Sequence, residues 1–323
     1  MSFLTTSQYS PQDLGLMINK AVVLKQNRPK FAKALAGKFL YMLFQKTSTR
    51  TALSFAAGIT ECGGSYLLQR WEDSNFGVGE IEDEIRYIAT SADVCVARLR
   101  SNEDIVRLAQ ASPIPIINGC CNKYHPCQAM ADMLTVFELF GSFEIKMLYV
   151  GVRNNVFNSL TSALTRLGGT LYALTPLVNE PSIEQSILDQ GREAGGLIEL
   201  ESDPEQMASA VKEVDVIYVD TWVDMEFFNE PSYAQEKQRR ISAMIPFQLN
   251  ENTLADSKAV VLHDMPMHAG YEITRPIIEA NISTILQQAD NRKYAQDAIL
   301  LTLLEDQAIR ELFSECGLKP NRP

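Results

Sequence analysis

Two α/β domains, each a parallel sheet flanked by helices and joined by interdomain helices, are the fold class that this sequence predicts. The chain has 323 residues, close to twice a typical domain length. Short apolar runs alternate with longer amphipathic segments, which is typical of parallel sheets wrapped by helices. The alternation restarts after Gly141. We therefore expect one domain over residues 1–140 and a second over residues 141–292, with a C-terminal helix over residues 293–323 packing back on the first.

In the first domain, the apolar run of residues 38–45 predicts a buried strand, after an N-terminal segment of about 35 residues that is largely helical. Residues 51–62 predict a helix that Gly63 and Gly64 end. A glutamate-rich helix is expected near residues 80–90, and short strands over residues 93–97 and 114–117. Pro126 is expected to open a helix that runs to about residue 140, because proline at the first helical position loses no hydrogen bond.

The second domain repeats the pattern. Strands are expected over residues 145–151, 170–175, 214–219 and 259–263, with a helix over residues 155–167 between the first two. The final helix should cover residues 293–313. Because ligands of such sheets bind at the carboxyl ends of the strands, we expect the site in the crevice between the two domains.

Composition excludes several classes of function. The chain has 29 Lys and Arg against 40 Asp and Glu, a net charge of -11, which argues against a nucleic-acid-coating protein and against binding to an anionic membrane. With 46% hydrophobic and 21% charged residues, it is an ordinary globular chain. The start has no signal-peptide pattern, and no apolar run reaches the ~18 residues of a membrane helix. Six cysteines without a CxxC pair predict a reduced, cytoplasmic protein.

The end of the first strand offers donors to an anion. Ser48, Thr49 and Thr51 bring hydroxyl groups and Arg50 a forked cation, next to the unpaired N–H groups of a helix start. Phosphate is the natural ligand of such a cradle, although the spacing is not that of a Walker loop. A helix cap made of Ser and Thr beside a surface Arg is an equally ordinary interpretation of the same residues.

The corresponding turn of the second domain runs from Gly151 to Asn155 and lacks the GxGxxG pattern. It therefore disfavours a dinucleotide site and NAD-dependent chemistry. Asn155 is expected to cap the following helix, to bind a ligand, or to do both, because its amide can donate to a carboxylate or accept from an ammonium group.

Three histidines occur, and they do not have metal-ligand spacing. His125 stands at a helix start, where the positive end of the dipole favours a neutral ring that can donate to a carbonyl oxygen, and Gln128 follows on the same face. Cys127 is a weaker candidate, a nucleophile whose thiol pKa the helix start would lower.

Asp220 and Asp264, which follows His263, each end an apolar strand. Because a buried carboxylate without a partner is costly, a cationic substrate group is its natural partner.

In order and spacing, the motifs of nearly the whole chain resemble those of the aspartate/ornithine carbamoyltransferases. The matching residues are Ser48-Thr49-Arg50-Thr51, Arg98, His125-Pro126-Cys127-Gln128, Asn154-Asn155, the tract from Asp220 to Met225, His263-Asp264-Met265-Pro266 and Asn291-Arg292.

The resemblance implies a first domain that binds carbamoyl phosphate and a second that binds the amino acceptor. It makes Ser48, Thr49, Arg50 and Thr51 the phosphate cradle, and it assigns the carbamoyl group to Arg98, His125 and Gln128, with Arg292 reaching back to the same ligand. Thr51, Arg98 and His125 would stabilise charge on the carbamoyl oxygen, and Asp264 joins them as a catalytic candidate. No metal, cofactor or covalent intermediate is implied.

On the acceptor side, the tract around Trp222 resembles the ornithine-type branch rather than the aspartate-type enzymes. The residues expected to hold the acceptor are Asn155, Asp220, Asp224, Met225, His263 and Asp264. Members are usually homotrimers, and Asn75 resembles the loop residue that a neighbouring subunit supplies.

Four positions depart from the family pattern. Ala52 replaces the usual Arg, Asn75 a Gln, Asp224 a Ser and Asp264 a Cys. Two additional carboxylates favour a more cationic acceptor. We therefore hypothesise carbamoyl transfer to an amine or guanidine nitrogen of a basic amino acid or related compound, such as ornithine, arginine, lysine or a diamine. The alternatives are an ordinary ornithine carbamoyltransferase that makes citrulline and a non-catalytic relative that binds carbamoyl phosphate.

Overall fold

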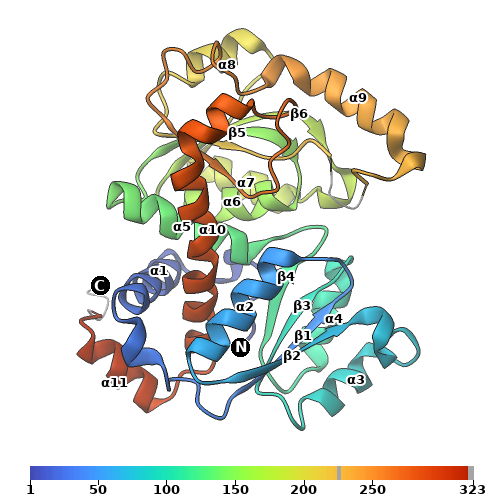
Figure 1. Ribbon diagram of the computed structural model, residues 1–323, viewed down its shortest axis with the longest axis vertical. Helices are drawn as coiled ribbons and strands as arrows, with labels where there is room; N and C mark the ends of the chain where they lie inside the picture. The colour runs from blue at the N-terminus through green and yellow to red at the C-terminus, as the bar shows by residue number, and fades with distance from the viewer. Residues whose placement is uncertain (224–226, 319–323) are drawn as a thin grey trace. The chain divides into compact units, whose positions relative to one another are not determined.

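The computed structural model describes residues 1–223 and 227–318 and confirms the predicted fold class, with two parallel sheets flanked by helices (Figure 1). The chain divides into unit 1, Met1–Glu138 with Asp290–Pro323, and unit 2, Leu139–Ala289. Two helices pass from one unit into the other along the chain, α5 (Pro126–Phe140) and α10 (Arg275–Leu303). In the part of the chain described here, no helix is long and apolar enough to cross a membrane.

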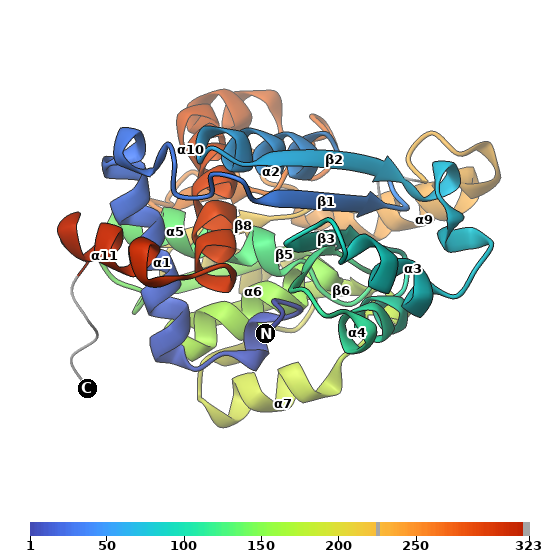
Figure 2. The ribbon, with the colours of Figure 1, turned by 90° about the horizontal axis from the view of Figure 1, so that it is seen from below.

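The sheet of unit 1 has four parallel strands in the order β2-β1-β3-β4. Their bounds are β1 Phe39–Phe44, β2 Ser65–Arg70, β3 Val94–Arg98 and β4 Ile116–Cys120. Helix α2 (Thr49–Glu61) lies on one side of this sheet, whereas α3 (Ile81–Ile88) and α4 (Asn102–Ala111) lie on the other (Figure 2). The first and last helices of the unit, α1 (Pro11–Gln26) and α11 (Gln307–Glu315), contact each other.

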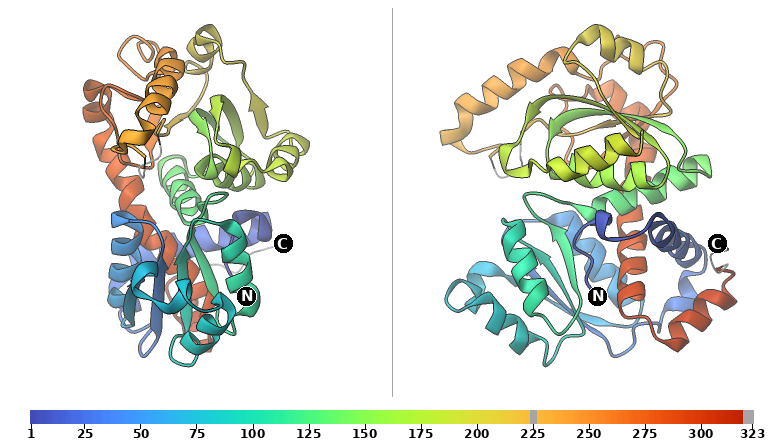
Figure 3. Two further views of the ribbon diagram at one scale, coloured as in Figure 1. Left: turned by 90° about the vertical axis from the view of Figure 1, so that its right-hand side faces the viewer. Right: turned by 180° about the vertical axis from the view of Figure 1, so that it is seen from behind.

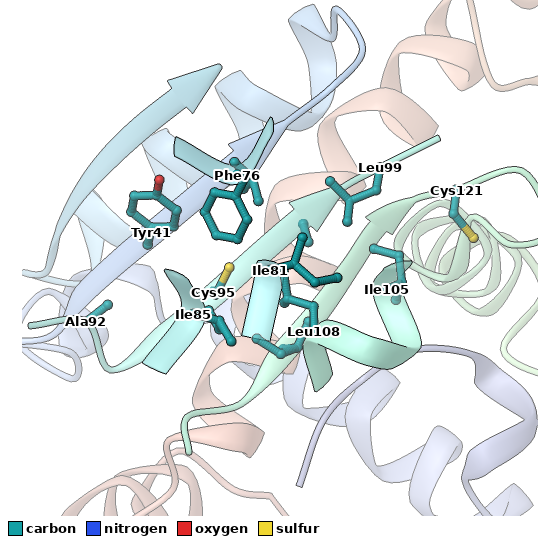
Figure 4. Close-up of a cluster of buried hydrophobic side chains, with 13 residues drawn as sticks. Tyr41, Phe76, Ile81, Ile85, Ala92, Cys95, Leu99, Ile105, Leu108 and Cys121 are labelled. Carbon is teal, nitrogen blue, oxygen red and sulfur yellow. The ribbon is translucent and has the colours of Figure 1, made fainter. Parts of the chain in front are cut away.

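The core on the α3 and α4 side follows from the period of two in the strands. Tyr41 and Leu43 of β1 and Cys95 and Ala97 of β3 belong to one buried cluster with apolar residues of the two helices. Figure 4 shows Tyr41 and Cys95 in this cluster. The helical members of this cluster are Ile81 and Ile85 on α3 and Ile105 and Leu108 on α4.

The sheet of unit 2 has five parallel strands in the order β7-β6-β5-β8-β9. Their bounds are β5 Lys146–Arg153, β6 Thr170–Val178, β7 Leu197–Glu199, β8 Val216–Val219 and β9 Val260–His263. Helices α6 (Asn155–Arg166) and α7 (Gln185–Glu193) pack together on one face, as the right-hand view of Figure 3 shows. Helices α8 (Pro204–Ala210) and α9 (Ala234–Met244) also belong to this unit, as does the first part of α10.

The C-terminal part differs from the prediction of one helix from residue 293. Helix α10 begins 18 residues earlier, at Arg275 with proline next, and it ends at Leu303. Asp306 then caps a separate helix, because its side chain accepts the Ile309 N–H at 2.9 Å. Glu305, in the break, is held by Lys20 at 2.6 Å and by Arg310 at 2.8 Å. These contacts are made by polar groups, some near in the sequence and some far from it, and the spacing of apolar residues does not predict them.

Sequence patterns also missed the edge strands β2 and β7. In β2, five of the six residues are exposed, and the apolar run Tyr66-Leu67-Leu68 is too short to set a strand period in the sequence. Helix α2 begins two residues before its predicted start, and the hydroxyl-rich segment of the proposed cradle therefore forms its cap and first turn.

The core of unit 1 should depend on Ile85, which is fully buried on α3. Replacing Ile85 with Ala leaves a cavity between α3 and the sheet and should lower the free energy of unfolding by about 2–5 kcal/mol in urea titrations. Tyr87→Ala is the matched control on the same helix, because this side chain is 75% exposed and its loss should change the value by less than about 0.5 kcal/mol. Equal losses in the two variants would contradict the described core.

Candidate active site

The start of α2 presents the hydroxyl groups of the predicted cradle. Ser48 is the N-cap, and its side chain accepts the Thr51 N–H at 3.2 Å. Thr49 is exposed, Arg50 is partly buried, and Thr51 is 1% exposed. Capping and ligand binding are therefore compatible here, because the cap uses one acceptor and leaves the donors of the first turn in place.

Arg292 on α10 links this helix start to the start of α5. One guanidinium nitrogen donates to Thr51 Oγ1 at 2.6 Å, and the other donates to Gln128 Oε1. Three groups that the sequence places far apart are thus in contact within unit 1. The three side chains are nearly inaccessible to water, so a change in one of them is transmitted to the others.

Asp132 fixes the orientation of Gln128. It lies one turn further along α5, is fully buried, and accepts the Gln128 Nε2 at 2.8 Å. The amide therefore presents its oxygen to Arg292 and its nitrogen to Asp132. Sequence reasoning missed Asp132, although its spacing of four residues from Gln128 on a helix was a usable signal.

His125 lies directly before α5 and is buried. Burial lowers the pKa of its ring well below the ordinary value, and the positive charges of Arg292, Arg98 and Arg50 lower it further. The ring is therefore neutral, as expected, but the helix dipole is not the main cause. Arg98 ends β3, and within the described chain its buried Nε has no hydrogen-bond partner.

Three arginines and a neutral imidazole form a cluster with a strong preference for an anion. Guanidinium groups suit phosphate oxygens because their N–H groups form a planar fork. A neutral imidazole N–H suits a carbonyl oxygen on which negative charge develops. The cluster can therefore bind a phosphate ester or anhydride and polarise a neighbouring carbonyl group.

Unit 2 contains a buried acidic group. Asp220 follows β8, is 1% exposed, and accepts hydrogen bonds from Tyr149 Oη at 2.9 Å, Asn154 Nδ2 at 2.8 Å and the Thr221 N–H at 2.7 Å. Burial, and then the neighbouring carboxyl of Asp264, raise the pKa of Asp220 well above its usual range despite these donors. A buried carboxyl group that resists ionisation beside a second carboxyl group would gain from a bound cation.

His263, at the end of β9, lies between two acids. Its Nδ1 is 3.4 Å from Asp264 Oδ1, and its Nε2 is 3.2 Å from Glu272 Oε1. Glu272 also accepts the His268 N–H at 2.5 Å. Burial raises the pKa of Glu272, but the two histidines outweigh it and lower the value to about 2.

The pKa of His263 and one of its hydrogen bonds point to different charge states of the ring. Burial lowers its pKa, yet hydrogen bonds to Asp264 and Glu272 raise it to about 9. The Met265 N–H, however, donates to Nδ1 at 2.8 Å, which requires a lone pair on that nitrogen. Because this backbone bond fixes the tautomer directly, we assign the ring proton to Nε2, facing Glu272. Met265 itself has a φ of 62°, a strained conformation often found at functional sites.

The remaining residues that the sequence analysis named are placed as follows. Asn154, not Asn155, caps α6, because its side chain accepts the Val156 and Phe157 N–H groups; Asn155 is the first helical residue. Asn75 is exposed in a short helical turn. Asp224 and Met225 lie outside the described residues. The helix start does not lower the pKa of Cys127, because complete burial raises it to about 12.

Sequence reasoning also missed Tyr149 and Glu272. Tyr149 lies inside a strand, and Glu272 lies in a loop eight residues after Asp264. No local spacing marked either residue. Among the described residues there is no group of three or more His, Cys, Asp or Glu that could hold a metal ion.

Two parallel α/β units, one with an arginine cluster and the other with buried carboxyl groups, suit a two-domain enzyme that acts on an anionic and a cationic substrate. Residues 1–138 match the family model described as aspartate/ornithine carbamoyltransferase, carbamoyl-P binding domain. Residues 143–303 match the model described as aspartate/ornithine carbamoyltransferase, Asp/Orn binding domain. The chain belongs to the aspartate/ornithine carbamoyltransferase family and is a carbamoyltransferase, as the resemblance implied.

Individual relatives cover almost the full length. An ornithine carbamoyltransferase of Archaeoglobus fulgidus is 36% identical over 307 residues, which are 93% of this chain and 96% of the relative. That of Bacillus subtilis is 35% identical over 93% of both chains. Among solved structures, ornithine carbamoyltransferase from Pyrococcus furiosus is similar with a TM-score of 0.83 and 34% identity, covering 93% of this chain and 96% of that one.

The cap of α6 gives a stability test. Asn154→Ala removes two acceptor contacts at the helix start and one donor to Asp220, so it should lower the free energy of unfolding by about 1–3 kcal/mol. Asn155→Ala, one position along, is the matched control and should have a smaller effect. Urea denaturation of the two variants measures the difference. A larger loss for Asn155→Ala would show that the cap is misassigned.

Proposed function

We propose that this chain transfers the carbamoyl group of carbamoyl phosphate to the side-chain amine of ornithine, producing citrulline and phosphate. The observation that carries the proposal is the contact of Arg292 with Thr51 and Gln128, which gathers the donors for a carbamoyl phosphate ligand in unit 1. The choice of ornithine is supported by the relatives reported above, which are named ornithine carbamoyltransferases.

Each unit would bind one substrate. We assign carbamoyl phosphate to unit 1, with the phosphate on Ser48, Thr49, Arg50 and Thr51 and the carbamoyl group near Arg98, His125, Gln128 and Arg292. The buried guanidinium of Arg98 and the neutral ring of His125 suit these roles. The amino acceptor would bind unit 2, held by Asn155, Asp220 and Met225 and by the loop that contains His263 and Asp264.

The chemistry follows from these assignments. The acceptor amine attacks the carbamoyl carbon only when deprotonated, a new C–N bond forms as the C–O bond to phosphate breaks, and the departing phosphate takes the second proton of the nitrogen. Negative charge develops on the carbamoyl oxygen, where Thr51, Arg98 and His125 would stabilise it. Loss of one such donor typically costs about 100- to 1000-fold in rate. Holding both substrates in reactive geometry supplies much of the remaining acceleration.

Asp264 is proposed as the acceptor of the amine proton. Its carboxyl is adjacent to that of Asp220, and its Oδ1 lies 3.4 Å from His263 Nδ1. An incoming ammonium group would be attracted to the pair, and one proton would pass from nitrogen to the Asp264 carboxylate. In the family pattern a Cys occupies this position, so the proton acceptor would be an oxygen instead of a sulfur atom.

A second candidate function is transfer to a more basic acceptor, such as lysine, arginine or a diamine. The carboxyl of Asp264 next to that of Asp220 favours this candidate, because a second carboxyl adds attraction for a cation. A charge pair at ~4 Å is worth about 4 kcal/mol at an effective dielectric of ~20, before desolvation is subtracted. The names of the reported relatives favour ornithine and lend this candidate no support.

We also infer a homotrimer in which Asn75 of one subunit reaches the carbamoyl phosphate of the next. Asn75 is exposed, and its carbonyl accepts the Val78 and Gly79 N–H groups, which give the turn a defined shape. An exposed, shaped turn is suited to contact a neighbouring subunit.

A panel of acceptors tests the proposed function. The purified chain is incubated with carbamoyl phosphate and ornithine, lysine, arginine or a diamine, and products are identified by mass spectrometry. We expect citrulline from ornithine at the highest kcat/KM. Turnover of lysine or arginine without ornithine would favour the second candidate. Binding of carbamoyl phosphate without any turnover would indicate a non-catalytic relative.

Asp264 provides a separate test. Asp264→Asn removes the negative charge and should lower kcat for ornithine by at least about 10-fold, because the carboxylate no longer accepts the amine proton. Asp264→Cys should recover part of the loss at high pH, where the thiolate forms. Asp256→Asn is the matched control, since Asp256 has a side chain that is 72% exposed. An unchanged kcat in Asp264→Asn would exclude the proton-acceptor role.

A further inference from the structure

A buried ion pair lies in unit 1 at the end of α2 away from the proposed cradle. Asp297 of α10 is fully buried, and its Oδ2 accepts Arg28 Nη1 at 2.6 Å. Arg28 follows α1 in a short 3₁₀ turn and is mostly buried as well. Nothing in the proposed reaction uses these two residues, and neither belongs to the motifs that define the resemblance.

Arg28 also holds the last turn of α2. Its Nη2 donates to the Gly58 carbonyl oxygen at 3.3 Å, and its Nε donates to Glu61 Oε2 at 2.8 Å. Lys293 of α10 reaches the other oxygen of Glu61 at 3.1 Å. Helix α2 is therefore attached to α10 at this end through two cations, Arg28 and Lys293.

Gly58 shows how closely the two helices approach. A Cβ built on Gly58 would overlap the Asp297 carboxylate, so only glycine allows Asp297 to lie against the α2 backbone. Glycine inside a helix lowers stability relative to alanine. The close approach of Asp297 gives a physical reason for glycine at this position.

The same two helices meet again at the proposed cradle. Arg292 contacts Thr51 at the start of α2, and Asp297 lies against Gly58 two turns later. At 1.5 Å per residue, these contact points are about 10 Å apart along α2. Two fixed points on each helix determine how far α2 can slide along α10. A shift of α2 would move Thr51 and Ser48 relative to Arg292.

We propose that Asp297, through its ion pair with Arg28, is a positioning residue that sets the register of α2 on α10 and thereby the affinity for carbamoyl phosphate. The inference rests on the proposed cradle at the start of α2. We call the group Arg28, Gly58, Glu61, Lys293 and Asp297 the α2 brace. Because the brace touches no substrate, it acts only through the position of the helix.

The brace should respond to pH. Burial raises the pKa of Asp297 to about 7, although the charges of Arg28 and Lys293 lower it. The charged or titratable groups around it are Arg28, Glu61, Cys62 and Lys293. Below about pH 7 the carboxyl is neutral and its ion pair with Arg28 is lost. Carbamoyl phosphate should therefore bind more weakly at pH 6 than at pH 8.

The stability of the protein should change in the opposite sense. A carboxyl whose folded-state pKa is raised contributes stability that is fully present below its unfolded pKa and is lost as pH rises through about 7. At pH 8, Asp297→Asn should therefore have an unchanged or higher melting temperature. If Asp297 had only a structural role, Asp297→Asn would instead lower the melting temperature and leave the binding of carbamoyl phosphate unchanged.

Calorimetric titration of the full chain with carbamoyl phosphate at pH 6 and pH 8 tests the proposal. At pH 8, Asp297→Asn should raise the dissociation constant by about 3- to 30-fold, the usual range for coupling at a distance. The dissociation constant of Asp297→Asn should also change less between pH 6 and pH 8 than that of the control variant. The matched control is Asp290→Asn, an exposed Asp on the same helix. Equal affinity and equal pH dependence of the two variants would overturn the proposal.

Two further measurements keep the test decisive. If Asp297→Asn does not fold, Arg28→Lys retains the charge without the forked geometry, and a raised dissociation constant is again expected.

Hydrogen exchange without ligand separates this proposal from the proposed function. If carbamoyl phosphate does not bind the unmodified chain, the cradle assignment fails, whereas faster exchange over residues 49–58 in Asp297→Asn still supports the brace. Unchanged exchange there overturns it.

Discussion

The contact of Arg292 with Thr51 and Gln128 is the interaction on which the site in unit 1 depends. One guanidinium determines where the starts of α2 and α5 lie relative to each other. Burying a cation is costly unless hydrogen bonds and a counter-charge offset it. Arg98 and Arg292 are both buried here, and with Arg50 they lower the pKa of His125. The two groups to which Arg292 donates, Thr51 and Gln128, are neutral and leave its positive charge in place, so an anion bound here would stabilise the region.

The site of unit 2 has an excess of acidic groups, whereas that of unit 1 has an excess of positive charge. Asp220 and Asp264 are adjacent, and the first resists ionisation because burial and its neighbour both raise its pKa. Glu272 is different, since His263 and His268 keep it ionised. Hydrogen bonds within the protein thus already favour the ionised form of Glu272, whereas the Asp220–Asp264 pair gains most from an external cation. This distinction explains why an ammonium group would bind at Asp220 and Asp264 rather than at Glu272.

The sequence predicted what depends on local pattern. Strands β1, β3, β5, β8 and β9 were expected within a few residues of their bounds, because apolar runs mark buried strands. The exposed strand β2 and the break before α11 were missed, because the apolar run of β2 has only three residues and polar contacts make the break. For the site, hydroxyl and charged residues at strand ends identified the candidate groups. The supporting residues Asp132, Tyr149 and Glu272 could not be identified, because folding alone brings them to their partners.

Helix α10 contributes to both charged regions. Gln288 accepts the His263 N–H at 2.9 Å within unit 2, and Arg292, one turn further along, donates to Thr51 within unit 1. Asp297 then fixes the same helix against Gly58. Because Arg292 and Asp297 lie on the same helix, their two contacts with α2 inside unit 1 depend on each other. The cost of burying an ionised Asp297 is therefore best understood together with Arg292: under the proposal, Asp297 sets where α2 lies on α10, and Arg292 depends on that position to hold an anion at the start of α2.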